Sequence, residues 1–282
     1  MICLDCRRRM VSPESNLPFT LHRDAQGKPY LLDHTSGIRA EIPSTCPGCG
    51  STRLHAMGAG TQRIEELLAQ QFPYARLLRA DSDTLTHPEH IRLLLKNMRE
   101  GKADILLGTQ SVVKGLDLPG ITLAAVLIAD VGLSLPHFRS GERIFQLLTQ
   151  LTGRSGRAQP GEVIIQTFRP EAPEVMLAAS HNTQKFLDDE LLLRIKAGYP
   201  PAQQIIRFIV REEGATRAQS LCRECKNISE KIKQDITVHA APMLFGGGNK
   251  WHVLLRGKNP EAVLGKLDLT GVIVDVDPVE CV

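Results

Sequence analysis

The sequence contains no apolar run of the roughly 18 residues that a membrane-spanning helix needs. Its first residues, MICLDCRRRM, hold too few apolar side chains for the core of a signal peptide. Internal repeats, low-complexity tracts and long linkers are absent as well. These absences argue against an integral membrane protein, and we expect a cytoplasmic chain with no membrane partner.

A strong charge of either sign is also absent. Lysine and arginine number 34 against 31 aspartate and glutamate, which gives a net charge of +3. This balance is too mild to indicate nucleic-acid binding by itself, although it permits local basic surfaces. The hydrophobic share of 42% is typical of a globular protein, and 282 residues are enough for two domains.

The character of the chain changes near residue 53. Residues 1–52 are polar and turn-rich, and their short β-type runs are interrupted at Gln26-Gly27 and Ser36-Gly37, which predicts a small sheet of two or three strands. In residues 53–197, the apolar runs ADILLGTQ, TLAAVLIAD and EVIIQTF alternate with helical patterns. Strands of this kind lack period-2 polarity and predict an α/β domain whose parallel sheet is covered on both faces.

A second change falls after Gly198, where Pro200-Pro201 cannot continue the preceding helical pattern. The segments that follow, in residues 198–282, have the order β-α-β-β-α-β. This order predicts a small ferredoxin-like α+β domain.

Six of the seven cysteines form C-x-x-C pairs, which in a cytosolic chain indicate metal or redox chemistry more than disulfides. The pairs Cys3-Cys6 and Cys46-Cys49 predict two knuckles that complete a closed tetrahedral zinc site with a structural role. Residues 7–45 would then loop out and return. The alternative is four unrelated reduced cysteines.

The third pair, Cys222 and Cys225, lies on a predicted helix without a second pair nearby. We expect these two cysteines to be ordinary helix residues. His22 and His34 are possible metal ligands, but surface histidines of the hairpin are the more common case.

Two arginines stand in a glycine-punctuated turn after a helix-like run, in QLLTQLTGRSGRA. The glycines allow a close approach of the backbone, and Arg154 and Arg157 offer planar guanidinium groups to phosphate oxygens. Gln150 precedes them. Taken alone, this string is equally compatible with a solvated basic turn.

A second polar segment lies upstream, in ADILLGTQSVVKGLDLP. A buried strand ends there at Gly108-Thr109-Gln110, and a short turn leads to Gly115 and Asp117. Because α/β sheets place ligand chemistry in the loops at the carboxyl ends of parallel strands, these residues suit contacts with phosphate.

Together, the two segments resemble motifs V and VI of superfamily 2 helicases, and residues 53–168 look like the second RecA-like lobe of such an enzyme. The order of GAGTQRIEELL after the CPGCG knuckle, GTQSVVKGLDLPGITLAAVLIAD, FRSGERIFQLLTQLTGRSGRA, the GYPP joint and the final DVDP is similar to the carboxy-terminal half of primosomal replication-restart helicases (PriA type). The resemblance covers nearly the whole chain.

The resemblance implies roles for particular residues. Gly108, Thr109 and Gln110 would touch the backbone of single-stranded DNA, and Gly115 and Asp117 would couple that grip to the nucleotide. The three residues that would face the γ-phosphate of ATP, with arginine stabilising the charge that develops in phosphoryl transfer, are Gln150, Arg154 and Arg157. Single-strand-binding or other replication-restart proteins, with DNA forks and single strands, are the implied partners.

The chain departs from the family in two ways. The family usually carries eight cysteines and two zinc sites in this region, whereas the four retained here imply one zinc ion. The phosphate-loop pattern G-x-x-x-x-G-K-S/T is absent, because Gly246–Lys250 lacks its spacing, and the acids of Asp188–Glu190 lie in a helical segment. Lobe 1 is therefore expected elsewhere, with ATP and magnesium bound only together with it, and the isolated chain is expected to show no ATPase activity.

The loop FGGGNK leads into a strand that begins with Lys250 and Trp251. An aromatic side chain with nearby cations suits single-strand binding. The only tryptophan of the chain is as readily a core residue of the small domain, but the resemblance favours a surface that contacts DNA or a partner.

Three hypotheses follow. The chain is part of an ATP-dependent replication-restart helicase, or it is an ATP-independent DNA- or partner-binding zinc module derived from one. The third hypothesis, a helicase of another superfamily 2 branch, does not explain the cysteine knuckles.

Overall fold

The computed structural model describes residues 1–14, 18–24, 26–33, 38–55, 61–80, 88–109, 120–133, 135, 137–153, 161–211, 214–243 and 250–279. The chain forms two compact units. The first comprises Met1–Ala56, Leu135–Ser140 and Gln184–Val282, and the second comprises Met57–Ser134 and Gly141–Thr183. The division into domains 1–52, 53–197 and 198–282 remains a prediction.

The N-terminal region of the first unit contains five short strands. The predicted small sheet is present and is antiparallel, with β2 (Thr20–Arg23), β3 (Pro29–Leu32) and β4 (Arg39–Ala40) in this order. Outside it, β1 (Ile2–Cys3) pairs with β5 (Leu54–His55) and brings the two ends of the region together.

The first predicted turn of this region lies between β2 and β3. Gly27 adopts a φ of 82°, in the left-handed region that glycine tolerates without strain. The carboxylate of Asp24 accepts hydrogen bonds from the backbone N–H groups of Gln26 and Lys28, at 3.0 and 2.8 Å. The second predicted turn, at Ser36-Gly37, lies outside the described residues.

The second unit contains two pairs of parallel strands, which confirms the predicted parallel pairing. In one pair β6 (Leu77–Ala80) lies beside β7 (Ile105–Gly108), and in the other β8 (Leu123–Val126) lies beside β9 (Glu162–Ile165). The expected burial on both faces is wrong for β8 and β9, because their side chains alternate between half-buried and exposed, and Ile164 is 54% exposed.

The helices in the described part of this unit are α1 (Thr61–Gln71), α2 (Pro88–Arg99), α4 (Asp130–Leu133), α5 (Ser140–Thr152) and α6 (Pro173–Ala179). On α5, Ile144, Phe145 and Leu148 are buried, at the spacing of one apolar face. The turn after α2 contains Gly101 with a φ of 63°, in agreement with the predicted helix end.

A bidentate ion pair joins the starts of β6 and β7. The guanidinium of Arg76 donates to the two carboxylate oxygens of Asp104 at 2.8 and 2.7 Å, and the backbone N–H of Arg76 donates to the same carboxylate at 2.9 Å. These hydrogen bonds hold the pKa of the Asp104 carboxyl well below its usual range. The pair thereby fixes the register in which the two strands begin.

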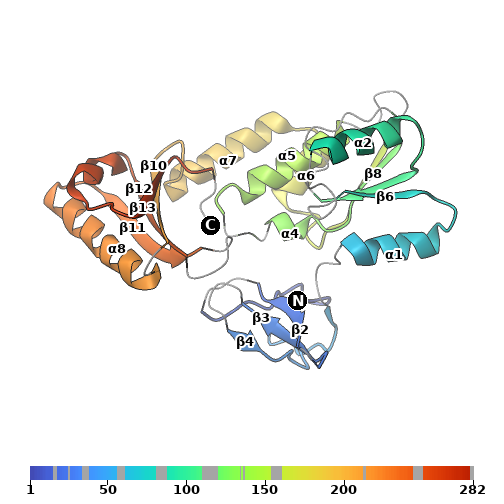
Figure 1. The fold of residues 1–282 in the computed structure, drawn as a ribbon, viewed down its shortest axis with the longest axis horizontal. Helices are drawn as coiled ribbons and strands as arrows, with labels where there is room; N and C mark the ends of the chain where they lie inside the picture. Colours follow the sequence, from blue (N-terminus) through green and yellow to red (C-terminus); the bar gives the residue numbers. More distant parts are fainter. Residues whose placement is uncertain are drawn as a thin grey trace. The chain divides into compact units, whose positions relative to one another are not determined.

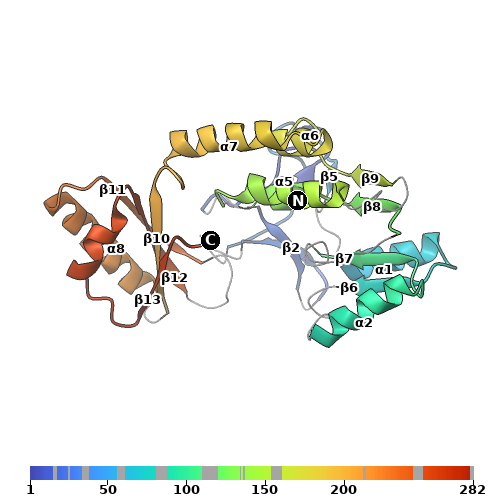
Figure 2. The same ribbon diagram turned by 90° about the horizontal axis from the view of Figure 1, so that it is seen from above.

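The C-terminal domain lies in the last segment of the first unit. It follows helix α7 (Thr183–Ala197) and has the element order that the sequence predicts (Figure 2). Its elements are β10 (Gln204–Val210), α8 (Gly214–Lys231), β11 (Ile236–Pro242), β12 (Trp251–Gly257), η1 (Pro260–Lys266) and β13 (Val272–Val276). The sheet is antiparallel throughout, in the order β11-β12-β10-β13, which matches a ferredoxin-like arrangement. The second predicted helix is a 3₁₀-helix of seven residues, which contains the poor helix formers Pro260 and Gly265.

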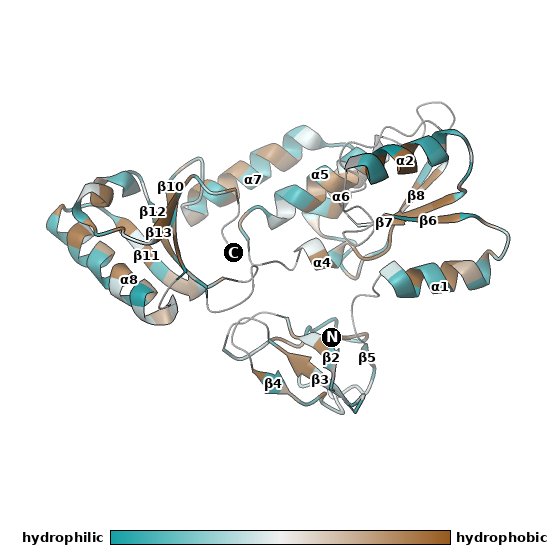
Figure 3. Ribbon diagram, in the orientation of Figure 1, coloured by the Kyte–Doolittle hydropathy of each residue, from teal (hydrophilic) through white to brown (hydrophobic). Residues whose placement is uncertain are grey.

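Helix α8 covers one face of this sheet (Figure 1). Strand β10 is hydrophobic along most of its length (Figure 3), and Phe208 on this strand is fully buried, as are Val253 and Leu255 on β12. Cys222 and Cys225 point into this core, and burial raises the pKa of the Cys225 thiol to about 12. Both cysteines are therefore helix residues of the core, as predicted.

No helix in the described part of the chain is both long enough and apolar enough to cross a membrane.

Candidate metal centre and phosphate-facing segments

The four cysteines of the N-terminal region meet in space. Their sulfur atoms all lie within 4.8 Å of one another. Two contacts link the knuckles, because Cys3 Sγ lies 3.6 Å from Cys49 Sγ and Cys6 Sγ lies 3.6 Å from Cys46 Sγ. A tetrahedron with metal–sulfur bonds of about 2.3 Å has edges of about 3.8 Å, so the four thiols fit a zinc-sized ion. The reading as four unrelated cysteines is wrong.

Local backbone geometry aims the sulfurs. Cys3 and Cys46 are buried, whereas Cys6 and Cys49 are exposed. In the second knuckle, the N–H of Gly48 donates to Cys46 Sγ at 3.4 Å. Gly50 has a φ of 73° and donates its N–H to the carbonyl of Cys46 at 2.9 Å, which closes the turn. A C-x-x-C-G sequence therefore forms a tight turn with amides directed at sulfur.

The electrostatics of the cluster also suit a cation. The backbone N–H of Cys6 is the main cause that lowers the pKa of Cys3 to about 6, and the N–H of Gly48 lowers that of Cys46. Although the N–H of Ser51 acts to lower the pKa of Cys49, the neighbouring thiols and burial raise it to about 12. The Cys49 thiol is therefore protonated near neutral pH, and a bound cation would favour its ionisation.

A polar contact links the two knuckles independently of any metal. The guanidinium of Arg53 donates to a carboxylate oxygen of Asp5 at 2.6 Å, and the hydroxyl of Ser51 donates to the other. The N–H of Arg53 donates in turn to the Ser51 hydroxyl at 3.0 Å. Sequence reasoning missed these three residues, because their only signal is a position inside or just after a knuckle.

The predicted phosphate-facing segments are described in part. Gly108 is the last residue of β7, and Thr109 follows it with its N–H 3.4 Å from the carbonyl of Ala80. Both therefore lie at the carboxyl end of a parallel strand, as predicted. The remaining residues predicted for this segment, Gln110, Gly115 and Asp117, lie outside the described part of the chain.

Gln150 lies exposed near the end of α5. The helix closes there, because the N–H of Gly153 and the hydroxyl of Thr152 both donate to the carbonyl of Thr149 at 3.0 Å. The helix-like run before the arginines is thus a helix. Arg154 and Arg157 lie beyond it, outside the described residues.

Trp251 is the first residue of strand β12, and Lys250 directly precedes it. Trp251 is partly buried and packs against the core of the C-terminal domain, and the carbonyl of Lys250 accepts the N–H of Met243 at 3.0 Å. The neighbouring His252 is buried, and burial together with the charge of Arg207 lowers its pKa to about 4. Trp251 therefore has a packing role, and contact with DNA would involve its exposed part.

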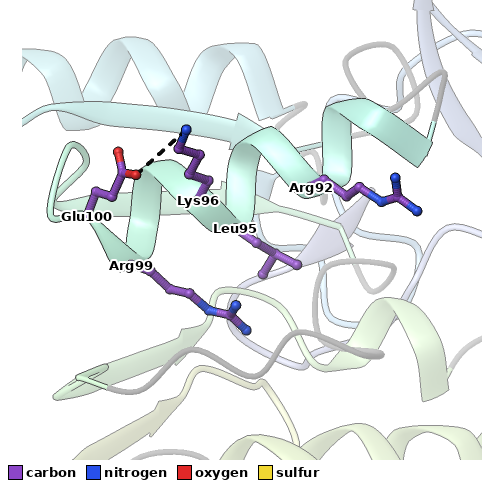
Figure 4. Close-up of a pocket in the computed structure, with 5 residues that line it drawn as sticks. All are labelled: Arg92, Leu95, Lys96, Arg99 and Glu100. Carbon is purple, nitrogen blue, oxygen red and sulfur yellow. Dashed lines mark ion pairs between the residues drawn. The ribbon is translucent and has the colours of Figure 1, made fainter.

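A shallow hollow of about 350 Å³ lies along α2 (Figure 4). In Figure 4, Arg92 and Arg99 project to the same side as Leu95, whereas Lys96 turns toward Glu100 and forms an ion pair with it at 3.9 Å. Sequence reasoning missed this face with its two arginines, although the spacing of i, i+3 and i+7 on one helix is a usable signal.

No protein-family model matches the chain. Curated proteins do match it. The chain is 42% identical over 219 residues to the replication restart protein PriA of Bacillus subtilis (strain 168), which covers 77% of this chain and 27% of that protein.

Two further relatives match almost the whole chain. Identity is 37% over 298 residues with the replication restart protein PriA of Chlamydia trachomatis, covering 98% of this chain and 39% of that protein. Identity is 30% over 299 residues with the replication restart protein PriA of Haemophilus influenzae, and the match covers 99% of this chain and 40% of that protein. The chain therefore spans less than half the length of these relatives.

Proposed function

Since the chain belongs to the PriA family of replication restart proteins and spans less than half of their length, we propose that it supplies one part of an ATP-dependent DNA helicase that acts in replication restart. In this proposal, residues 53–197 form the second RecA-like lobe, residues 1–52 hold one structural zinc ion, and residues 198–282 contact DNA or a partner. The phosphate loop and the acidic magnesium motif come from a segment outside this sequence.

The observation that carries the proposal is the arrangement of α5 and β7. Helix α5 ends with Gln150 exposed, and the glycine-punctuated arginine pair follows directly in the sequence. Strand β7 ends at Gly108, where the polar segment begins. Because α/β sheets gather ligand chemistry at the carboxyl ends of parallel strands, the position after β7 supports the proposed contact.

In the proposed reaction, Arg154 and Arg157 act as arginine fingers. Their guanidinium groups donate hydrogen bonds to oxygens of the γ-phosphate and stabilise the negative charge that develops as it is transferred to water. Gln150 faces the same γ-phosphate and helps to orient the two arginine side chains around it. Thr109 and its neighbours hold the backbone of the translocated single strand, which couples turnover to movement on DNA.

ATP turnover tests the proposal directly. The purified chain alone is expected to hydrolyse no measurable ATP, because arginine fingers without a phosphate loop have no bound phosphate to act on. Joined to a family polypeptide that carries a phosphate loop and the magnesium motif, the chain is expected to support hydrolysis that single-stranded DNA stimulates.

The control is that polypeptide without this chain, which should remain near its basal rate. Robust turnover by the 282-residue chain alone would refute the division of labour. Equal turnover with and without the chain would favour the alternative, an ATP-independent zinc module that binds DNA or a partner.

Lys250 is expected to contact a phosphate of single-stranded DNA. The Lys250→Gln variant should bind oligonucleotides of different sequence more weakly by a similar factor, because a phosphate contact carries no sequence information. The slope of log affinity against log salt concentration should fall in magnitude by about 0.7, the value for one released counterion on a single strand. Fluorescence anisotropy over a salt series measures both quantities.

The matched control for Lys250 is Lys266→Gln, which removes an exposed lysine at the end of η1 in the same domain. It should leave the slope unchanged. An unchanged slope in Lys250→Gln would show that this lysine touches no phosphate.

A further inference from the structure

Two aromatic rings from distant parts of the sequence stack within the first unit. The rings of Phe138 and Tyr199 are nearly parallel, with an interplanar angle of 8° and centroids 5.1 Å apart. A guanidinium lies over each ring, that of Arg194 at 5.1 Å from the Phe138 centroid and that of Arg256 at 4.6 Å from the Tyr199 centroid. Stacked aromatic rings and cation–π contacts are both attractive, so the four groups form one continuous contact.

The groups around Tyr199 are held in place by separate interactions. Arg194 forms a largely buried ion pair with Glu190, with Nε 2.8 Å from the carboxylate oxygen. Gly198, with a φ of 66°, turns the chain after α7, and the N–H of Tyr199 donates to the carbonyl of Arg194 at 2.9 Å. Arg256 stands on β12, in the middle of the C-terminal sheet. The groups around Tyr199 are therefore held by interactions other than its stack with Phe138.

Phe138 is held by a compact turn at the start of α5. The hydroxyl of Ser140 donates to the carbonyl of Leu135 at 2.8 Å, and the N–H of Arg139 donates to His137 Nδ1 at 2.9 Å. His137 and Ser140 are each 7% exposed. Ser140 is also the first residue of α5, so the turn and the helix form one continuous piece of backbone.

The topology gives this contact its importance. Residues Leu135–Ser140 belong to the first unit, although the residues on both sides of them in the sequence belong to the second. Between Met57 and Thr183, the chain belongs to the first unit only at Leu135–Ser140. The Phe138–Tyr199 stack is a contact that holds the turn there.

We propose that Phe138 and Tyr199 are positioning residues that hold the turn Leu135–Ser140, and with it the first residue of α5, within the first unit. An α-helix is stiff over the length of α5, so a change at its first residue is passed along the helix toward its end, where Gln150 lies and the arginine pair follows in the sequence. Neither ring touches the nucleotide in this proposal. The part that concerns ATP turnover rests on the proposed function, whereas the contact itself does not.

Hydrogen exchange of the purified chain tests the contact by itself. Phe138→Leu keeps apolar volume but removes the planar ring, and it should speed amide exchange in residues 198–203 by about two- to tenfold, the range expected for the loss of one aromatic pair. Tyr199→Leu should speed exchange in residues 137–140 by a similar factor, because coupling is reciprocal. Phe138→Tyr and Tyr199→Phe keep the stack and should exchange like the unchanged chain.

The matched control is Phe72→Leu, which removes a 53% exposed phenylalanine ring beyond α1 in the other unit. It should alter neither segment. Unchanged exchange in residues 198–203 of Phe138→Leu, or equal effects of leucine and tyrosine at position 138, would overturn the proposal.

Turnover tests the consequence for α5. When joined to the phosphate-loop polypeptide, Phe138→Leu should lower kcat at least twofold with KM for ATP unchanged, and Phe138→Tyr should restore it. A simple loss of folded protein would not be rescued in this way. Faster amide exchange with an unaltered kcat would overturn the positioning role. Absence of ATP turnover in the unchanged chain would refute the proposed function, and the exchange measurements would then still test the contact between the two rings.

Discussion

Arg157→Ala is expected to abolish nearly all ATP hydrolysis by the chain joined to a phosphate-loop polypeptide. An arginine that stabilises the transition state of phosphoryl transfer is worth about 10³- to 10⁵-fold in kcat. Arg154→Ala should cause a loss within the same range if both arginines reach the γ-phosphate. Because the groups act mainly in the transition state, kcat should fall while KM for ATP changes little.

Two comparisons sharpen this expectation. Arg157→Lys keeps the charge but loses the planar fork, so it should recover only a small part of the rate. Arg223→Ala removes an exposed arginine of α8 and should leave turnover unaltered. Steady-state ATPase assays with single-stranded DNA measure all of these variants. A loss of less than tenfold in both Arg154→Ala and Arg157→Ala would rule out a finger role.

Removal of the metal is expected to unfold the N-terminal region. We predict one zinc ion per chain, held by Cys3, Cys6, Cys46 and Cys49, and none in Cys46→Ser. Structural zinc sites contribute roughly 10–16 kcal/mol of apparent binding energy, which is comparable with the whole stability of a domain. The Asp5–Arg53 pair is exposed and contributes little by comparison.

Metal analysis and limited proteolysis check this prediction. Residues 1–55 should become sensitive to protease in Cys46→Ser and in the unchanged chain treated with a strong chelator. Cys222→Ala should keep one zinc ion, because that thiol contacts the core of the C-terminal domain. Retention of a full equivalent of zinc by Cys46→Ser would show that the cluster is not the binding site.

Local sequence patterns were sufficient to predict those features of the fold that have a local physical cause. A C-x-x-C-G knuckle closes through its own backbone, so Cys46 and Cys49 were identifiable as members of a cysteine cluster without a structure. The end of α5 after Gln150 and the turn at Gly101 follow from helix and glycine preferences. The order of elements in the C-terminal domain could be read in the same way.

Features that depend on how distant segments meet could not be read from the sequence. The order β11-β12-β10-β13 depends on which strands pair, and the sulfur contacts Cys3–Cys49 and Cys6–Cys46 depend on how β1 and β5 close the N-terminal region. The expected cover on both faces of β8 and β9 was wrong for a related reason. An apolar strand reveals its preference for burial but not which neighbour provides it.

The sequence by itself identified the four cysteines that form the cluster, the family, and the residues proposed to face the phosphate, because each of these is carried by residue type at short spacing. Only the tertiary structure decided that Phe138 stacks on Tyr199. It also decided that the turn Leu135–Ser140 belongs to the first unit, whereas the residues before and after it in the sequence belong to the second. Neither aromatic residue belongs to a local pattern that points to the other. Their contact arises from packing, which depends on all of the elements around them.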